Sequence, residues 1–301
     1  MTTLQGSSIL VVGATGGLGR HLARQLADAG AHLTLSARSM TDLEALGIPG
    51  QLVPADLTDP AAVRTLVATA VIAHGQLDGI VNAAGAVAFG ALADTADDTI
   101  EALWAINALA PMRMLRAALP SLRESAEQGR EPFVLTLSGV VSEHPTNGIG
   151  AYSAVKSALA AYVQVAAREV RRSGIRVIDA RPGHTETELS RHPIAGETPK
   201  FPTGLEPAAV AQRIVAAIAG DEKDLPSTAF SEVPAATSQM VKAEEATTPT
   251  GAHPAVAMAA QMPLETAESA PAAGSAADGG SAPGGGSAAD GGSAPDGGHH
   301  A

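Results

Sequence analysis

The sequence predicts an α/β fold in which helices cover both faces of a doubly wound parallel sheet. Short apolar segments alternate with stretches of helical periodicity from about residue 7 to residue 230, which is the pattern of repeated strand–helix units. The apolar segments are hydrophobic throughout, as expected of strands that are buried on both faces of a sheet. Aromatic residues make up only 2% of the chain, so Ala, Val, Leu and Ile must build the core. Together these observations predict a single Rossmann-like domain.

Strands and helices follow one another along this domain. The predicted strands are Ser8–Val12, His32–Ser36, Gln51–Pro54, Gly79–Val81, Pro132–Ser138, Ile175–Ala180 and Asp224–Phe230. The predicted helices are Gly17–Ala29, in which Leu18, Leu22 and Leu26 recur at helical spacing, and Pro60–His74, Asp97–Gln128, Ala151–Ser173 and Glu206–Ala219. Such alternation makes right-handed crossovers, and ligands bind beyond the carboxyl ends of the strands. We therefore expect the functional residues just after the strands.

The charge and the absence of cysteine exclude several classes of site and partner. The formal net charge is −12 and the pI is about 5.1, which argues against binding to nucleic acid or anionic membranes, because both reward clustered Lys and Arg. The chain has no cysteine, which excludes disulfides, thiolate metal sites and cysteine nucleophiles. No apolar run reaches the roughly 18 residues of a membrane span, and the N-terminus lacks the pattern of a secretory signal. We expect a cytoplasmic protein.

The composition changes toward the C-terminus. After the predicted domain at residues 1–230, residues 231–270 form an Ala- and Pro-rich transition, and residues 271–301 are almost wholly Gly, Ser, Ala, Pro and Asp. A twelve-residue unit repeats there, at Gly274–Gly285 and Gly286–Gly297, without any large apolar side chain. Such a segment cannot offset the entropy of ordering itself, so we predict a disordered C-terminal tail.

A glycine-rich turn follows the first strand. Helix N-termini present N–H groups and a positive dipole end to anions, and glycines let the backbone approach a diphosphate closely. The predicted nucleotide contacts in the turn are Gly13, Thr15, Gly16, Gly17, Leu18 and Gly19. The motif alone is equally compatible with a tight turn that binds no ligand.

Three further strands end in candidate ligand residues. Arg38 follows the second strand, where an arginine favours the 2′-phosphate of NADP(H) over NAD(H), unless it is a solvated surface residue. Asp56 follows the third strand and either accepts a hydrogen bond from an adenine amino group or caps the next helix, and the adjacent Leu57 is a further candidate cofactor contact. The fourth strand is followed by a segment of small residues that allows close approach to a ligand or makes a simple turn, with Asn82, Ala83 and Gly85 as the candidate contacts.

Tyr152 and Lys156 lie four residues apart in a predicted helix, so they share one face about one turn apart. A tyrosine with a pKa near its reference value of about 10 is a poor acid–base catalyst at neutral pH. An ammonium group beside it stabilises the phenolate and lowers the pKa. The pair is therefore a candidate proton-transfer group, although a buried tyrosine beside a surface lysine has the same spacing.

In this order, these residues resemble the short-chain dehydrogenase/reductase family over about Ser7 to Phe230. The resemblance rests on the glycine-rich turn, Asp56, NAAG at Asn82–Gly85, Asn107 in WAINALAP, YSAVK at Tyr152–Lys156, and RPGHTETEL with Pro182, Gly183 and Thr185. It implies hydride transfer between NADP(H) and a small ketone, aldehyde or secondary alcohol. It also implies a homodimer or homotetramer, formed through the helices at Asp97–Gln128 and Ala151–Ser173.

The resemblance also implies a role for each matching residue. Tyr152 would protonate the carbonyl oxygen or deprotonate the alcohol, and Lys156 would bind the nicotinamide ribose and lower the Tyr152 pKa. Asn107 would hold a water that links Lys156 to solvent. The segment Pro182–Thr187 would cover the nicotinamide, with Thr185 or Thr187 near its carboxamide.

The chain departs from the family pattern at two places. Val12 stands where a threonine is usual, and the glycines fit both the spacing Gly13, Gly17, Gly19 and the spacing Gly13, Gly16, Gly19 of extended epimerase-like members. More seriously, the serine that polarises the carbonyl normally lies about thirteen residues before the tyrosine, and here that residue is Gly139. We expect Ser138 to replace it, with Ser142 as the substitute.

The substrate pocket is expected under the segment His184–Pro207, with His144, Ile149, His184 and Phe89 as wall residues rather than metal ligands. Two other functions remain open on the same fold. One is a nucleotide-binding regulator without turnover, which the glycine at position 139 suggests. The other is an epimerase or isomerase that uses the cofactor transiently. A further alternative is an interaction protein that acts through its acidic tail.

Overall fold

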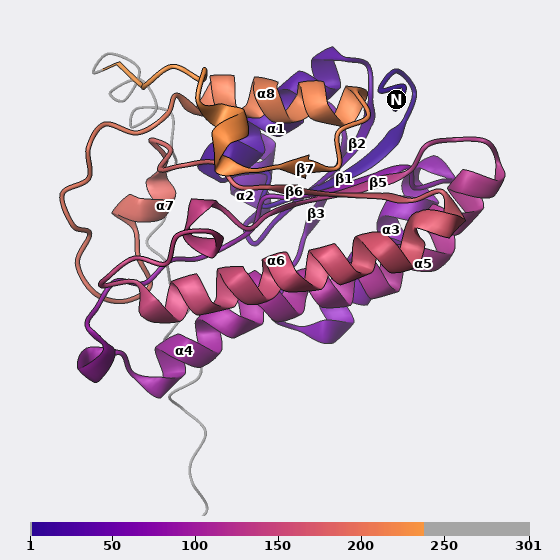
Figure 1. Ribbon diagram of the computed structural model, residues 1–301. Helices are drawn as coiled ribbons and strands as arrows, with labels where there is room; N and C mark the ends of the chain where they lie inside the picture. The colour runs from indigo at the N-terminus through magenta and orange to yellow at the C-terminus, as the bar shows by residue number, and fades with distance from the viewer. Residues whose placement is uncertain (1, 238–301) are drawn as a thin grey trace, which may run out of the picture. The chain divides into compact units, whose positions relative to one another are not determined.

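The computed structural model describes residues 2–237 and shows a seven-stranded sheet in which all neighbouring strands are parallel (Figure 1). The strand order is β3-β2-β1-β4-β5-β6-β7. The strands are β1 (Ser8–Val12), β2 (His32–Ala37), β3 (Gln51–Pro54), β4 (Gly79–Asn82), β5 (Phe133–Leu137), β6 (Arg176–Ala180) and β7 (Asp224–Leu225). The predicted doubly wound parallel sheet is thereby confirmed.

Helices cover both faces of the sheet, with α1 and α8 on one face and α3, α5 and α6 on the other (Figure 1). The helices are α1 (Gly17–Asp28), α2 (Met40–Ala45), α3 (Pro60–His74), α4 (Asp97–Trp104), α5 (Ala110–Glu127), α6 (Gly150–Val170), α7 (Glu188–Arg191) and α8 (Pro207–Ala219). The turns at the carboxyl ends of β1, β4, β5 and β6 therefore lie at one edge of the sheet, where the site is built.

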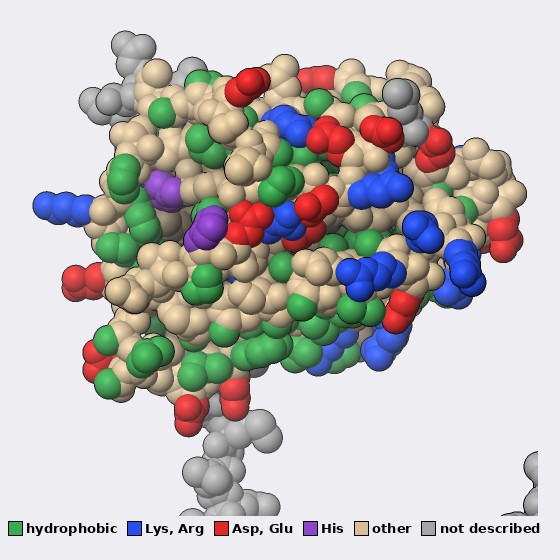
Figure 2. Space-filling view, in the orientation of Figure 1, with side chains coloured by type: hydrophobic (Ala, Val, Ile, Leu, Met, Phe, Trp, Pro, Cys, Tyr) green, Lys and Arg blue, Asp and Glu red, His purple; other side chains and the backbone are tan. Residues whose placement is uncertain are grey.

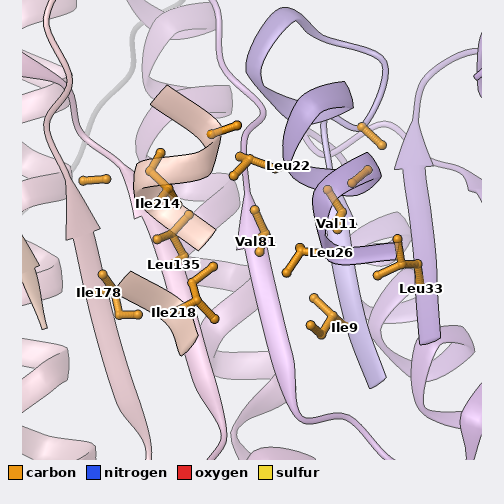
Figure 3. Packing of buried hydrophobic residues seen from close by; sticks show 14 of the residues in the cluster. Ile9, Val11, Leu22, Leu26, Leu33, Val81, Leu135, Ile178, Ile214 and Ile218 are labelled. Carbon is orange, nitrogen blue, oxygen red and sulfur yellow. The ribbon is translucent and has the colours of Figure 1, made fainter. Parts of the chain in front are cut away.

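The core consists of two layers, one on each face of the sheet. Ile9 and Val11 of β1 pack toward α1 and α8, whereas Leu10 and Val12 pack toward α3, α5 and α6. Figure 3 shows the first layer, in which Leu22 of α1 and further aliphatic side chains fill the space above the sheet. Aliphatic residues on both faces of one strand explain why the strands read as continuous apolar runs.

Three local features differ from the prediction. The predicted strand Asp224–Phe230 ends at Leu225, because Pro226 lacks a backbone donor, and Ser227–Phe230 forms a 3₁₀ turn. The predicted helix Asp97–Gln128 is divided by a π-helical segment, η2 (Ala105–Leu109). The short helix α2 was not predicted; Ser39 caps it by accepting a hydrogen bond from the Asp42 amide.

The predicted tail at residues 271–301 and most of the transition at residues 231–270 lie outside the described residues. Within residues 2–237, none of the helices combines the length and the apolar composition that a membrane span requires.

Candidate active site

The turn between β1 and α1 needs glycine at three of its positions. Gly13 has a φ of +71°, and a Cβ atom there would lie 2.6 Å from the Ala84 nitrogen. A Cβ on Gly19 would overlap the Gly13 carbonyl oxygen, and one on Gly17 would overlap the Thr187 side chain. A Cβ on Gly16 would meet only the Gly13 oxygen, at 3.3 Å. The crowding favours the spacing Gly13, Gly17, Gly19 of the short dehydrogenases.

The N-terminus of α1 is suited to an anion. No side chain caps the helix at Gly16, and its first turn contains no acidic residue. The N–H groups of the first turn and the positive end of the helix dipole therefore point into the glycine-lined turn. These uncapped N–H groups and the positive end of the helix dipole fit a dinucleotide diphosphate.

Arg38 lies beside this turn. The Ala14 amide donates to the carbonyl oxygen of Ser36 at 3.0 Å, which ties the turn to the end of β2, and the exposed Arg38 follows two residues later. Asp56 is exposed and accepts hydrogen bonds from the amide and hydroxyl of Thr58. The helix cap that follows is Asp59, which accepts from the Ala61 amide. Leu57 is buried between them.

The segment after β4 connects the glycine-rich turn with the predicted catalytic residues Asn107 and Lys156. Asn82 is buried at the end of β4, and the Ala83 amide donates to the Val12 carbonyl. Ala84 lies against Gly13, as described above. At the other end of the segment, a Cβ on Gly85 would lie 2.9 Å from Asn107 Oδ1 and 3.7 Å from Lys156 Nζ. One four-residue segment therefore contacts both the predicted phosphate turn and the predicted catalytic residues.

Asn107 lies in the π-helical segment η2, a form that often occurs at functional sites. Its side-chain amide donates to the carbonyl oxygens of Ala86 at 2.9 Å and Leu103 at 3.0 Å, and its Oδ1 accepts from the Ala86 amide at 3.3 Å. These bonds fix the Asn107 side chain beside Gly85. The wider turn of the π-helical segment places the buried Asn107 side chain against the segment after β4.

Tyr152 and Lys156 share one face of α6, as predicted. Lys156 Nζ lies 5.6 Å from the centre of the Tyr152 ring and donates to the Leu137 carbonyl oxygen at 2.7 Å. Lys156 is only 6% exposed, and burial lowers its pKa to about 8, against the opposing effect of the Asp179 charge. Burial raises the pKa of Tyr152. The direction is therefore opposite to the lowering that the spacing predicts, and burial is its cause.

The serines of the site are engaged in the protein's own hydrogen bonds. Ser138 is fully buried, and its hydroxyl donates to Asp179 Oδ2 at 2.7 Å. Ser142 Oγ lies 2.7 Å from the Gly139 carbonyl oxygen and 3.2 Å from Ser138 Oγ. A hydroxyl has one proton to donate, so this geometry speaks against Ser138 as the group that polarises a substrate carbonyl. Gly139 has a φ of +74° and a ψ of 163°, in a region that only glycine adopts readily.

The segment Pro182–Thr187, predicted to cover the nicotinamide, contacts the glycine-rich turn through Thr187. Pro182 is buried and its carbonyl accepts from the Val140 amide, while Thr185 Oγ1 donates to the Gly183 carbonyl. Thr187, against Gly17, comes closer to the turn than Thr185 does in the contacts described.

Of the predicted wall residues, Phe89 and Ile149 are buried in one apolar cluster, and His144 is exposed. Sequence reasoning missed Phe201, whose ring lies 5.9 Å from Phe89 and 4.6 Å from His184. A pattern that could have indicated this residue is its position in a polar segment, because the chain has only four phenylalanines.

Sequence reasoning also missed Asp179 and Arg181. The sequence does contain a pattern that indicates them, namely two charged residues at the end of an apolar strand. Such side chains are seldom buried without partners, so both were candidates for an ion pair.

Known proteins share both the sequence pattern and the fold. The profile of the family described as short chain dehydrogenase matches residues 7–197. The bovine dehydrogenase/reductase SDR family member 7B is 30% identical over 237 residues, which cover 72% of each chain. A metagenomic short-chain oxidoreductase, solved in complex with NADP, is 26% identical with a TM-score of 0.61 and matches 75% of this chain and 97% of its own. A Brucella melitensis 3-ketoacyl-(acyl-carrier-protein) reductase complexed with NADH shares the fold, with a TM-score of 0.66 at 21% identity over 74% of this chain and 98% of its own.

Proposed function

Because the chain belongs to the short-chain dehydrogenase/reductase family, we propose that it is an NADP(H)-preferring oxidoreductase of small carbonyl compounds or secondary alcohols. The observation that carries this proposal is the segment Asn82–Gly85. It packs against the glycine-rich turn at Ala84 and against Asn107 and Lys156 at Gly85. A dinucleotide that lies along this segment would have its phosphates at the α1 N-terminus and its nicotinamide beside Tyr152.

The residues that would hold the dinucleotide come from the carboxyl ends of the strands. The α1 N-terminus would bind the diphosphate, Arg38 and Asp56 would bind the adenosine half, and Lys156 the nicotinamide ribose. The Pro182–Thr187 segment would exclude water from the nicotinamide. When bound, NADP(H) supplies or accepts the hydride.

Tyr152 is proposed as the proton donor to the carbonyl oxygen and, in reverse, as the acceptor of the alcohol proton. The phenol is protonated at neutral pH, which is the form that donates in reduction, but its raised pKa means that proton transfer needs the phenolate to be stabilised. Lys156 supplies a positive charge next to the ring that stabilises the phenolate once the proton has left. With Ser138 and Ser142 engaged elsewhere, we propose that Tyr152 acts without a polarising serine.

Arg38→Asp is expected to abolish the preference for NADPH over NADH. The wild-type chain should bind NADPH at least about tenfold more tightly, because an arginine pairs with the 2′-phosphate and a carboxylate repels it. Fluorescence titration of the full chain with each nucleotide measures the ratio. Arg64→Asp, an identical charge change at an exposed position of α3, is the control and should keep the preference. If the wild-type chain binds NADPH and NADH with equal affinity, Arg38 does not bind the 2′-phosphate.

Gly139→Ser is expected to destabilise the fold rather than to restore a catalytic hydroxyl. A side chain at this φ and ψ costs about 1–3 kcal/mol, although the space around a Cβ is open. Urea unfolding should show this loss, and turnover should not rise. Gly139→Ala is the matched variant, which should lose the same stability because the cost lies in the backbone. A serine variant with wild-type stability and faster turnover would contradict the backbone argument.

Gly139 also favours a second candidate, a nucleotide-binding regulator without turnover. In that case the chain binds NADPH but reduces no carbonyl compound. Turnover by the wild type, lost in Tyr152→Phe, decides between the two functions.

We also propose a homodimer or homotetramer assembled through the helices at Asp97–Gln128 and Ala151–Ser173, which the structure forms as α4, η2, α5 and α6. Figure 2 shows apolar side chains along the lower part of the face where Figure 1 places α4, α5 and α6. Trp104, Leu109 and Val165 are the large apolar residues exposed in these helices and the π-helical segment between them. A surface of this kind is typical of an interface between subunits.

A further inference from the structure

One peptide group joins Lys156 to a buried carboxylate. The carbonyl oxygen of Leu137 accepts a hydrogen bond from Lys156 Nζ at 2.7 Å. The N–H of the same peptide group, on Ser138, donates to Asp179 Oδ1 at 3.3 Å. The ammonium and the carboxylate therefore polarise this peptide group in the same sense, and each hydrogen bond strengthens the other.

The Asp179 side chain is held firmly in this position. It is only 3% exposed, at the end of β6, and its second oxygen accepts from Ser138 Oγ at 2.7 Å and from Arg181 Nη1 at 2.8 Å. Burial raises the pKa of Asp179, but the hydrogen bonds from Ser138 and Arg181 oppose this effect and favour the ionised form.

Arg181 does not neutralise the cluster. Its guanidinium group also binds Glu143 and, at 2.8 Å, Asp224, so that one positive charge faces three carboxylates. Burial would lower the pKa of Arg181, but these hydrogen bonds raise it. Arg181 therefore divides its charge among three carboxylates, and Asp179 is the one whose charge acts on Lys156. Among the described residues, Tyr152 on α6 and Asp179 on β6 are the titratable groups identified as facing the ammonium.

We propose that Asp179 is a positioning residue, which holds the Lys156 ammonium in place and in its charged form through its own charge and the Leu137–Ser138 peptide group. The inference rests on the proposed function, in which Lys156 is charged. It also gives the buried Ser138 a role, since this serine anchors the carboxylate rather than contacting the substrate. Lys156 is buried, and burial alone would favour its neutral form.

Two substitutions test the proposal, because they should move the Lys156 pKa in opposite directions. Asp179→Asn removes the negative charge and should lower it by about one unit or more. Arg181→Gln removes a positive charge and leaves the Asp179 carboxylate, so this substitution should raise the Lys156 pKa. General damage to the site would not shift the two variants in opposite directions. Asp224→Asn is the control, because this carboxylate binds the same Arg181 but is 61% exposed; it should shift the pKa least.

The measurement is a ¹³C NMR titration of the lysine side chains in the full chain. The sequence has only four lysines, at 156, 200, 223 and 242, so a Lys156→Arg variant identifies the signal. Shifts of the same sign in both variants, or no shift in Asp179→Asn, would overturn the proposal. If Asp179→Asn does not fold, an unchanged or lowered pKa in Arg181→Gln overturns it alone.

The titration needs neither substrate nor nucleotide, so it tests the role of Asp179 separately from the proposed enzymatic function. A chain that neither binds NADPH nor reduces carbonyl compounds would refute the proposed function, and the NMR shifts would still decide the role of Asp179. In an active chain, the alkaline limb of the pH profile for reduction should move with the Lys156 pKa, downward in Asp179→Asn and upward in Arg181→Gln. Equal loss of kcat at every pH would indicate a purely structural role.

Discussion

Replacing Tyr152 with phenylalanine is expected to lower kcat for carbonyl reduction by about 10²–10⁴-fold, the usual contribution of a positioned proton donor. The ring and its contacts with the apolar clusters around Ala88 and Phe89 remain, so folding and NADPH affinity should stay close to those of the wild type. Steady-state kinetics and a nucleotide titration on the same preparation measure both quantities.

The chain provides a matched control for this substitution. Tyr162 is the only other tyrosine, and it lies on the same helix α6. Tyr162→Phe removes an equivalent hydroxyl at a half-buried position and should keep full turnover. If Tyr152→Phe reduces carbonyl compounds as fast as Tyr162→Phe, the proton comes from another group and the proposed mechanism is wrong.

Gly19→Ala is expected to weaken NADPH binding by about tenfold to a hundredfold. The new methyl group would overlap the Gly13 carbonyl oxygen, which is backbone and cannot rotate away. Overpacking of this kind typically costs about 1–3 kcal/mol of stability unless the backbone shifts. We expect the shift of the turn to weaken its contacts with the diphosphate by a similar free energy, and each 1.4 kcal/mol is a factor of about ten in affinity. The turn must open, and opening it displaces the amide groups that are proposed to bind the diphosphate. Fluorescence titration with NADPH gives the two affinities.

Gly16→Ala tests whether this loss comes from the overlap or from any methyl group in the turn. Its Cβ would meet only the Gly13 oxygen, at 3.3 Å, so its affinity should fall much less. If the two variants lose affinity equally, the spacing Gly13, Gly17, Gly19 does not define the site.

Much of the fold could be predicted because the pattern is local. The strands Ser8–Val12 and Gln51–Pro54 and the helix Pro60–His74 have the predicted bounds. Each begins or ends at a residue with a clear physical effect, such as Asp59, which caps α3 immediately before a proline. The resemblance to the short-chain dehydrogenases, rather than a local pattern, grouped the glycine-rich turn, Asn107 and the Tyr152–Lys156 pair in one predicted site.

The remaining features depend on tertiary contacts. The π-helical segment around Asn107 has no pattern of its own in a continuous helical sequence. Whether Ser138 faces a substrate or a buried carboxylate depends on Asp179, which is 41 residues away in the chain. The pKa of Tyr152 depends on how deeply α6 packs, and spacing alone suggested the opposite direction.

The most direct test of the central claim is transfer of deuterium from NADPH labelled at both C4 positions to a panel of small ketones and aldehydes. Mass spectrometry of the alcohol products should find one deuterium per molecule formed by the wild type, and at least about a hundredfold less labelled product with Tyr152→Phe in the same time. NADPH that binds saturably without labelling any product would contradict the oxidoreductase proposal and leave the regulator as the function of this fold.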